Sequence, residues 1–192
     1  MISADSCRTS HAPCQKERGP VATMRTSPRE LTLEQQHLLL EACPPDLGRL
    51  VRAALLTACR LGELARLRVR DYSPYQQTIH LEPGKTGQAR ELGLTEDGDQ
   101  FFCDLSLGRN GEELLFLKRS GRPMPSRDGN GVPCGWLQFD VKRQRNKVGK
   151  QIGIGDLHFH DLRTTWVSNA VARGLSIQCI SSQLGHSQGR RP

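Results

Sequence analysis

The chain has 192 residues, an ordinary length for one domain, with 36% hydrophobic and 24% charged residues. This balance is typical of a globular protein with a modest core and excludes a membrane-embedded one. Lysine and arginine number 27 against 20 acidic residues, which gives a formal net charge of +7. A basic chain favours an anionic partner, usually nucleic acid, but charge alone leaves a domain without such a partner equally open.

Seven cysteines are scattered along the chain, and none belongs to a C-x-x-C pair. The odd count and the irregular spacing argue against a zinc ribbon or a secreted disulfide framework, and they favour a reducing cytosol. The N-terminus lacks the apolar core of a signal peptide, and no apolar run is long enough to span a bilayer. We therefore expect a cytoplasmic protein with no membrane partner.

Residues 1–29 mix Ser, Thr, Pro, Arg and Lys with few large apolar side chains. This composition predicts a disordered polar tail, followed by one folded domain at 30–192. Thr32 and Gln35 have the spacing of a capping box, so a helix is expected to begin there. The proline pair that starts at Pro44 is expected to end it.

A second helix is expected directly after the prolines, with Asp46 as its capping residue. Its apolar side chains recur on one face, at Leu47, Leu50, Val51, Ala54 and Leu55. A third helix is predicted from near Arg60 to about Val69.

Two short segments, 78–81 and 91–94, have strand-like sequences. The Pro- and Gly-containing segment 83–87 between them is typical of a hairpin loop. A further helix is predicted from Thr95 to Leu107, where Gly108 stops it.

Residues 119–135 are rich in Gly, Pro, Ser and Arg and are expected to form a surface loop. A basic helix is expected to follow, from about Trp136 through Lys147, and to break at 149–155.

Two helices are expected near the end of the sequence. One spans about 160–172 and ends at Gly174, and the other spans 176–184 and is closed by Gly185. Helices thus flank one short sheet. The predicted fold is mainly α with a small antiparallel β-sheet, an α+β domain.

Arg60 and Glu63 are three residues apart and share a helix face. Taken alone, such a pair is more often a weak surface ion pair than a site. Cys59 and Leu61 flank the arginine, however, which places it at the packed start of a helix. From there its guanidinium can present a bidentate fork to a phosphate.

His160 and Arg163 are also three residues apart. For this pair taken alone, a capping histidine with a surface arginine is the stronger rival explanation. His158 and His160 could be a metal pair on a strand, but no acidic or cysteine partner stands at ligand spacing, so we predict no metal site. Lys85 in a turn and His186 after a helix are each unremarkable alone.

Together these segments form a more specific pattern. In chain order they are Arg60-Leu61-Gly62-Glu63-Leu64, Lys85-Thr86-Gly87, His160-Asp161-Leu162-Arg163 and Leu184-Gly185-His186. Over about residues 31–187 they resemble the boxes of the tyrosine recombinase (phage integrase) family. The resemblance implies a mostly helical catalytic domain that clamps double-stranded DNA and cuts it through a covalent 3′-phosphotyrosine link.

The resemblance also implies a role for each site residue. Arg60 and Arg163 would bind the non-bridging oxygens of the scissile phosphate, where charge grows in the transition state. Lys85 would protonate the leaving 5′-oxygen, and His160 would accept the proton of the attacking tyrosine.

Two further residues complete this set. His186 would hydrogen-bond the phosphate, and Glu63 would support the assembly and orient its basic groups. No metal or other cofactor is expected, because the arginines and the lysine neutralise the developing charge.

The nucleophile is where the resemblance fails. The family places its tyrosine shortly after the box that matches Leu184-Gly185-His186, and residues 187–192 contain none. Tyr72 and Tyr75 match a loop of the family and are not expected to serve. The family's preceding DNA-clamping domain has no counterpart in residues 1–29. We therefore expect a catalytic domain incomplete at both ends, which binds DNA without cutting it.

A smaller departure is Ala58, which stands where the family usually has glycine and is expected to tighten the turn before Arg60. Two other interpretations stay open, a non-catalytic DNA-binding regulator and a decaying remnant of a mobile-element integrase. In the first, DNA contacts would come from a basic run that is otherwise a solvated helix face, and whether the protein forms a homo-oligomer on DNA is left open. That run comprises Lys142, Arg143, Arg145, Lys147 and Lys150.

Overall fold

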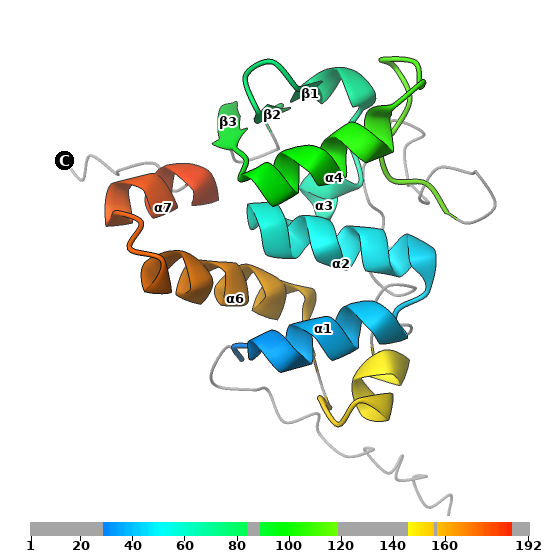
Figure 1. Cartoon of the computed structure of the whole chain (residues 1–192), viewed down its shortest axis with the longest axis vertical. Helices are drawn as coiled ribbons and strands as arrows, with labels where there is room; N and C mark the ends of the chain where they lie inside the picture. The colour runs from blue at the N-terminus through cyan, green and yellow to red at the C-terminus, as the bar shows by residue number, and fades with distance from the viewer. Residues whose placement is uncertain (1–28, 84–88, 119–145, 156, 186–192) are drawn as a thin grey trace, which may run out of the picture.

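The computed structural model describes residues 29–83, 89–118, 146–155 and 157–185. Helices make up most of this part, and one three-stranded antiparallel sheet lies against them (Figure 1). The predicted α+β class is therefore confirmed. None of the helices in these ranges has both the length and the apolar character that crossing a membrane requires.

Helix α1 (Leu33–Ala42) begins where the sequence predicts. The Thr32 hydroxyl accepts a hydrogen bond from the backbone N–H of Gln35 at 3.2 Å, and the Gln35 side chain accepts one from the backbone of Thr32 at 3.1 Å. This reciprocal pair satisfies two N–H groups that a helix start leaves unpaired. The helix ends before Pro44, because the residue preceding a proline is forced into an extended conformation.

Helix α2 (Pro45–Thr57) runs through the middle of the molecule, with α4 on one side and α1 and α6 on the other (Figure 1). The apolar face predicted for it is the buried face, although Leu55 is only partly covered. Asp46 does not cap the helix as predicted. Pro44 is the N-cap, and the Asp46 carboxylate accepts from the N–H of Leu47 inside the first turn. Pro45 causes this shift, because its fixed φ suits the first helical position.

Helix α3 (Leu61–Leu64) is a single turn, so the prediction of a helix reaching Val69 is wrong. The chain beyond it pairs with residues 113–115 instead. The carbonyl of Leu67 accepts from Leu115 at 2.8 Å, and the N–H of Val69 donates to Glu113 at 2.9 Å. These long-range backbone bonds replace the helical ones, and the 3₁₀ turn η1 (Val69–Asp71) follows.

The sheet consists of β1 (Tyr72–Ser73), β2 (Thr78–Leu81) and β3 (Arg90–Gly93), in that spatial order. Strand β2 has the predicted bounds, and β3 lies one residue earlier than predicted. Strand β1 was not predicted, because two residues carry no alternation to detect. In the antiparallel register Leu81 faces Arg90. Most of the predicted hairpin loop, including Lys85, lies outside the described residues.

Helix α4 (Glu96–Ser106) confirms the predicted helix, with Thr95 as its N-cap. Gly108 follows with φ +70°, a conformation that glycine adopts without strain. The helix buries Phe102 completely. The Phe102 ring makes an edge contact with Phe101, with centroids 5.1 Å apart, and joins helix to sheet in the main core.

Helices α6 (Phe159–Ala172) and α7 (Ile177–Leu184) confirm the last two predicted helices. The predicted loop at 119–135 and most of the predicted basic helix lie outside the described residues. Of that helix the structure shows helical residues 146–151, where Lys147 is exposed. The break predicted at 149 therefore begins later.

The predicted polar tail lies outside the described residues, apart from Arg29. Its Nη1 donates to the carbonyl of Gly155 at 2.7 Å, and its backbone N–H donates to Asp161 at 3.3 Å. Leu31 donates to the Thr165 hydroxyl at 3.0 Å. The start of the described chain is thus fastened to α6.

Gly149 lies against the backbone that follows its helical turn. A Cβ at this position would stand 2.5 Å from the carbonyl oxygen of Ile154. Replacing a helical glycine with alanine usually stabilises a protein by about 1 kcal/mol. Here we expect Gly149→Ala to lower the free energy of unfolding by about 1–3 kcal/mol, because the backbone must move. Urea denaturation measures this.

The matched control is Gly155→Ala, because a Cβ at Gly155 would meet no atom within 4 Å. We expect this variant to remain as stable as the parent. A Gly149→Ala protein that is equally stable or more stable would contradict the close approach.

Candidate active site

The first predicted arginine box begins where α2 ends. Ala58 is fully buried, with φ 57° and ψ 18° in the left-handed region, and it turns the chain through Cys59 to Arg60. Alanine adopts this region at a cost of about 1 kcal/mol, and glycine would adopt it freely. The turn thus has the shape that a glycine favours, and alanine holds it under strain.

Arg60 is the N-cap residue of α3, and its side chain is 54% exposed. Glu63 binds it twice. The carboxylate accepts from the backbone N–H of Arg60 at 2.8 Å and from its Nη1 at 2.9 Å. The predicted pair therefore exists as an ion pair whose guanidinium remains open to solvent.

The same carboxylate also binds Arg90 at the start of β3, a residue that the sequence did not single out. Arg90 Nη2 lies 3.0 Å from Glu63 Oε2, and both side chains are almost covered, at 13% and 12% exposure. Arg90 Nε donates to the carbonyl of Gln183 in α7 at 3.3 Å. Only the position of Arg90 directly before the predicted strand 91–94 could have drawn attention to it.

Arg163 is buried in α6 with 5% exposure, so the alternative of a surface arginine at this position is wrong. Its Nη1 donates to the carbonyl of Ala58 at 2.7 Å, and its Nη2 donates to the carbonyl of Leu184 at 2.6 Å. These carbonyls end α2 and α7, where helices leave oxygens unpaired and the dipole favours a cation. Arg163 therefore joins α6 to the ends of α2 and α7. Two of its five N–H donors make these bonds, and the other three make no hydrogen bond to described residues.

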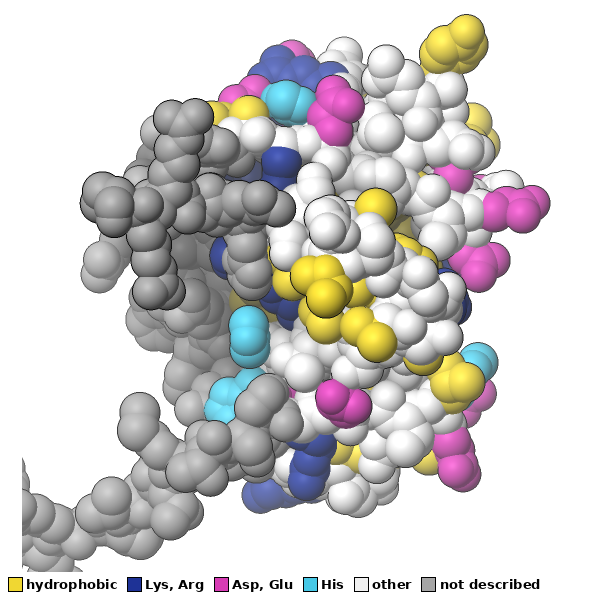
Figure 2. Space-filling model, turned by 90° about the vertical axis from the view of Figure 1, so that its left-hand side faces the viewer, with side chains coloured by type: hydrophobic (Ala, Val, Ile, Leu, Met, Phe, Trp, Pro, Cys, Tyr) yellow, Lys and Arg dark blue, Asp and Glu magenta, His cyan; other side chains and the backbone are white. Residues whose placement is uncertain are grey.

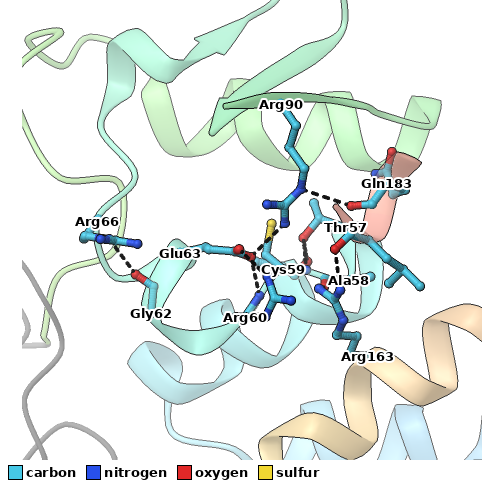
Figure 3. A network of polar contacts seen from close by, with 12 residues as sticks. Thr57, Ala58, Cys59, Arg60, Gly62, Glu63, Arg66, Arg90, Arg163 and Gln183 are labelled. Atoms are coloured by element: carbon cyan, nitrogen blue, oxygen red, sulfur yellow. Dashed lines mark hydrogen bonds and ion pairs between the residues drawn. The ribbon is translucent and has the colours of Figure 1, made fainter. Parts of the chain in front are cut away.

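Figure 3 shows Arg60, Arg90 and Arg163 arranged around Glu63 and Cys59. Burial raises the pKa of Glu63, but the Arg60 backbone and the two neighbouring guanidinium groups outweigh this and hold it below its ordinary value. Burial and the charge of Arg60 lower the pKa of Arg163. Three guanidinium groups around one carboxylate leave a net positive site that suits an anion.

Of the remaining predicted site residues, the structure describes only some. His160 is exposed in the first turn of α6, and the residue that caps this helix is His158. Lys85 and His186 lie outside the described residues, as do Lys142, Arg143 and Arg145 of the basic run. In the described ranges, no group of three or more His, Cys, Asp or Glu side chains could hold a metal ion.

The two tyrosines of the chain lie in different surroundings. The Tyr72 hydroxyl donates to the Asp99 carboxylate at 2.5 Å, and burial together with this carboxylate raises its pKa well above the ordinary range. Tyr75 is 97% exposed in the turn between β1 and β2. Burial also raises the pKa of the Cys59 thiol to about 12, so it stays protonated at neutral pH.

Residues 29–191 match the profile of the phage integrase family. The chain belongs to this family. The predicted membership in the tyrosine recombinase (phage integrase) family is thus confirmed.

The curated relatives of this integrase-family chain include two tyrosine recombinases and a phage integrase. XerA of Saccharolobus solfataricus is 26% identical over 150 residues, which cover 77% of this chain and 45% of XerA. The integrase of Salmonella phage P22 is also 26% identical over 150 residues, or 38% of its length. XerC of Roseiflexus sp. is 27% identical over 193 residues, covering 92% of this chain and 57% of XerC. The chain thus spans about half the length of these relatives.

Solved structures of integrases share the fold. A crystal structure of XerA recombinase matches with a TM-score of 0.64 and 23% identity, over 88% of this chain and 58% of that one. A lambda integrase tetramer bound to a Holliday junction matches with a TM-score of 0.65 and 20% identity, over 90% and 51% of the two chains.

Basic and acidic side chains both occur on the face of this integrase domain that Figure 2 shows. Dark blue lysine and arginine side chains gather at its upper and lower edges and appear in smaller parts between them, and magenta acidic side chains lie beside the upper group as well as along the right-hand border.

Proposed function

We propose that this integrase-family domain binds double-stranded DNA with one phosphodiester group against Arg60 and Arg163. It is the DNA-binding catalytic domain of a site-specific recombinase, built for metal-independent cleavage and rejoining through a phosphotyrosine. The observation that carries this proposal is the meeting of Arg60 from α3 and Arg163 from α6 in one net positive site. The lambda integrase, whose fold is similar, has been solved on a Holliday junction, which supports a DNA ligand.

The proposed chemistry depends on the guanidinium N–H groups of Arg60 and Arg163. Arg60 is half-exposed, and three N–H groups of Arg163 make no hydrogen bond within the described residues, so both arginines can stabilise charge on the phosphate oxygens. His160 is exposed on the same helix as Arg163 and is proposed as the general base. Lys85 is proposed as the general acid, and His186 as a hydrogen-bond donor to the phosphate.

The 192 residues are proposed to bind DNA in the cytoplasm without forming a covalent link to it. The hydrogen bond from Tyr72 to Asp99 supports this, since it engages the hydroxyl of the buried one of the two tyrosines. The same observation favours the second candidate function, a DNA-binding regulator with no strand cleavage. A homo-oligomer on DNA fits either role, and the lambda integrase tetramer is a precedent for it.

The test of DNA binding is Arg60→Ala. Because its guanidinium is exposed, its loss should leave the fold intact and weaken binding to a labelled DNA duplex about tenfold or more. The slope of log affinity against log salt should fall by about one, the share of one phosphate contact. Fluorescence anisotropy over a salt series measures both.

The control is Arg173→Ala, which removes an equal charge about 15 Å farther along α6 than Arg163, by the rise of the helix. If both variants lose the same affinity, binding depends on net charge and the site assignment is wrong. The same mixtures run on a denaturing gel should show no covalent protein–DNA band. Such a band would overturn the non-cleaving part of the proposal.

A further inference from the structure

Arg90 connects three elements at the edge of the candidate site. It belongs to β3, its Nη2 binds Glu63 of α3 at 3.0 Å, and its Nε binds the carbonyl of Gln183 in α7 at 3.3 Å. Its side chain is only 13% exposed. An arginine at this depth is held by its partners on both sides, whereas a solvated arginine would move among many positions.

Gly185 makes room for this contact. It ends α7 with φ +66°, and a Cβ there would lie 3.0 Å from Cδ, Nε and Cζ of Arg90. The arginine side chain therefore lies across the glycine at the end of α7. Gln183 also donates from its side chain to the carbonyl of Gly93 in β3 at 3.3 Å, which fastens the same two elements.

Two arginines share the end of α7. The carbonyl of Gln183 accepts from Arg90, and the next carbonyl, that of Leu184, accepts from Arg163. The position of Arg163 relative to β3 is thus set through consecutive carbonyls of one helix end. Displacing Arg90 would loosen the helix end to which Arg163 is bonded.

Arg90 and Arg60 share the negative charge of the Glu63 carboxylate. One carboxylate oxygen of Glu63 accepts from Arg90 and from the backbone of Arg60, and the other accepts from the Arg60 guanidinium. Because Arg90 takes part of the negative charge, Glu63 neutralises Arg60 only in part. The Arg60 guanidinium is therefore held in position by Glu63 and still carries positive charge that can attract a phosphate.

We propose that Arg90 is a positioning residue for phosphate binding: it acts through Arg60 and the end of α7, and does not touch the phosphate. This inference rests on the proposed DNA-binding function. It assigns a role at the site to a residue outside the predicted boxes.

The test is a double-mutant cycle on DNA affinity with Arg90→Gln and Arg60→Ala. In the parent protein Arg90→Gln should weaken binding to the labelled duplex about fivefold to tenfold. In the Arg60→Ala background it should weaken binding by a clearly smaller factor than in the parent, because the part of its effect that passes through Arg60 is already lost and only the part through the end of α7 remains. Arg90→Lys keeps the charge but cannot reach both partners, so it should recover only part of the affinity.

Additive losses in the cycle would show that Arg90 contacts DNA by itself, which overturns the positioning role but leaves the proposed function standing. If Arg60→Ala alone does not weaken binding, the proposed function fails and the inference fails with it. A full recovery with Arg90→Lys would also overturn the inference, since charge alone would then suffice.

A second variant covers the case in which Arg90→Gln does not fold. Gly185→Ala leaves every charge in place and pushes the Arg90 side chain aside. Alanine adopts the same left-handed conformation at Ala58 of this chain, so the variant is expected to fold. Its affinity should fall, but less than that of Arg90→Gln, because the Arg90 side chain is displaced and not removed. Unchanged affinity in a folded Gly185→Ala protein would overturn the positioning role.

Discussion

Replacing Arg163 with alanine is expected to lower the free energy of unfolding by about 3–5 kcal/mol. The change removes the donors of two buried carbonyls, those of Ala58 at 0% and Leu184 at 7% exposure. Each buried acceptor left without its donor costs about 1–3 kcal/mol, and the packing of the arginine stem is lost as well. Urea denaturation followed by circular dichroism measures the change.

Two variants calibrate this result. Arg163→Lys keeps the charge, but one ammonium group cannot bond both carbonyls, so an intermediate loss is expected. Arg60→Ala removes a half-exposed ion pair and should cost at most about 1 kcal/mol. If Arg163→Ala were no more damaging than Arg60→Ala, the junction of three helices would not depend on this guanidinium.

This difference decides how DNA-binding data should be interpreted. An Arg163→Ala protein that fails to bind DNA has two explanations, a lost phosphate contact and a lost fold. Arg60→Ala has only the first, because its guanidinium bonds no buried backbone oxygen in the described structure. Arg60 is therefore the informative position for testing the site.

Replacing Glu63 with glutamine is expected to lower the free energy of unfolding by about 3 kcal/mol at neutral pH. The carboxylate is 12% exposed and is the shared partner of Arg60 and Arg90. A neutral amide of the same shape leaves two guanidinium groups without their counter-charge, next to that of Arg163. Removing one partner of a buried ion pair is strongly destabilising for this reason.

The pH dependence of this loss has a definite sign. The folded-state pKa of Glu63 lies below its ordinary value. Its ionised carboxylate therefore stabilises the fold fully above the unfolded-state pKa of about 4.3, and this contribution is lost as the pH falls through the folded-state pKa. The gap between the parent and Glu63→Gln should close in acid. Urea denaturation at neutral and acidic pH measures the gap, and a gap of constant size would mean that the charge of Glu63 does not stabilise the fold.

Local chemistry explains which elements could be predicted from the sequence. The capping box at Thr32 and the left-handed glycines Gly174 and Gly185 affect only residues a few positions away. The helices that they start or end appear as predicted. The length of α3 depends on pairing with residues 113–115, far along the chain, and was overestimated. The two-residue strand β1 likewise exists only because β2 pairs with it.

The site residues also differ in whether the sequence could identify them. Arg60 and Arg163 could be named from the sequence because short boxes surround them. What Arg163 does for the fold could not, because its bond to Ala58 joins residues 105 positions apart. Arg90 was missed for the same reason, since its partner Gln183 lies 93 positions away. A local sequence pattern cannot predict which helix ends lie together in the fold.

The burial of Arg163 between two helix ends also affects how this protein can change during evolution. If the proposed DNA binding were lost, a lineage would still be selected to keep Arg163, because losing it is expected to destabilise the domain strongly. Arg60 has no comparable protection, since its side chain is half-exposed and its ion pair is weak. Among descendants of this chain, the persistence of Arg60, rather than that of Arg163, would mark continued selection for phosphate binding.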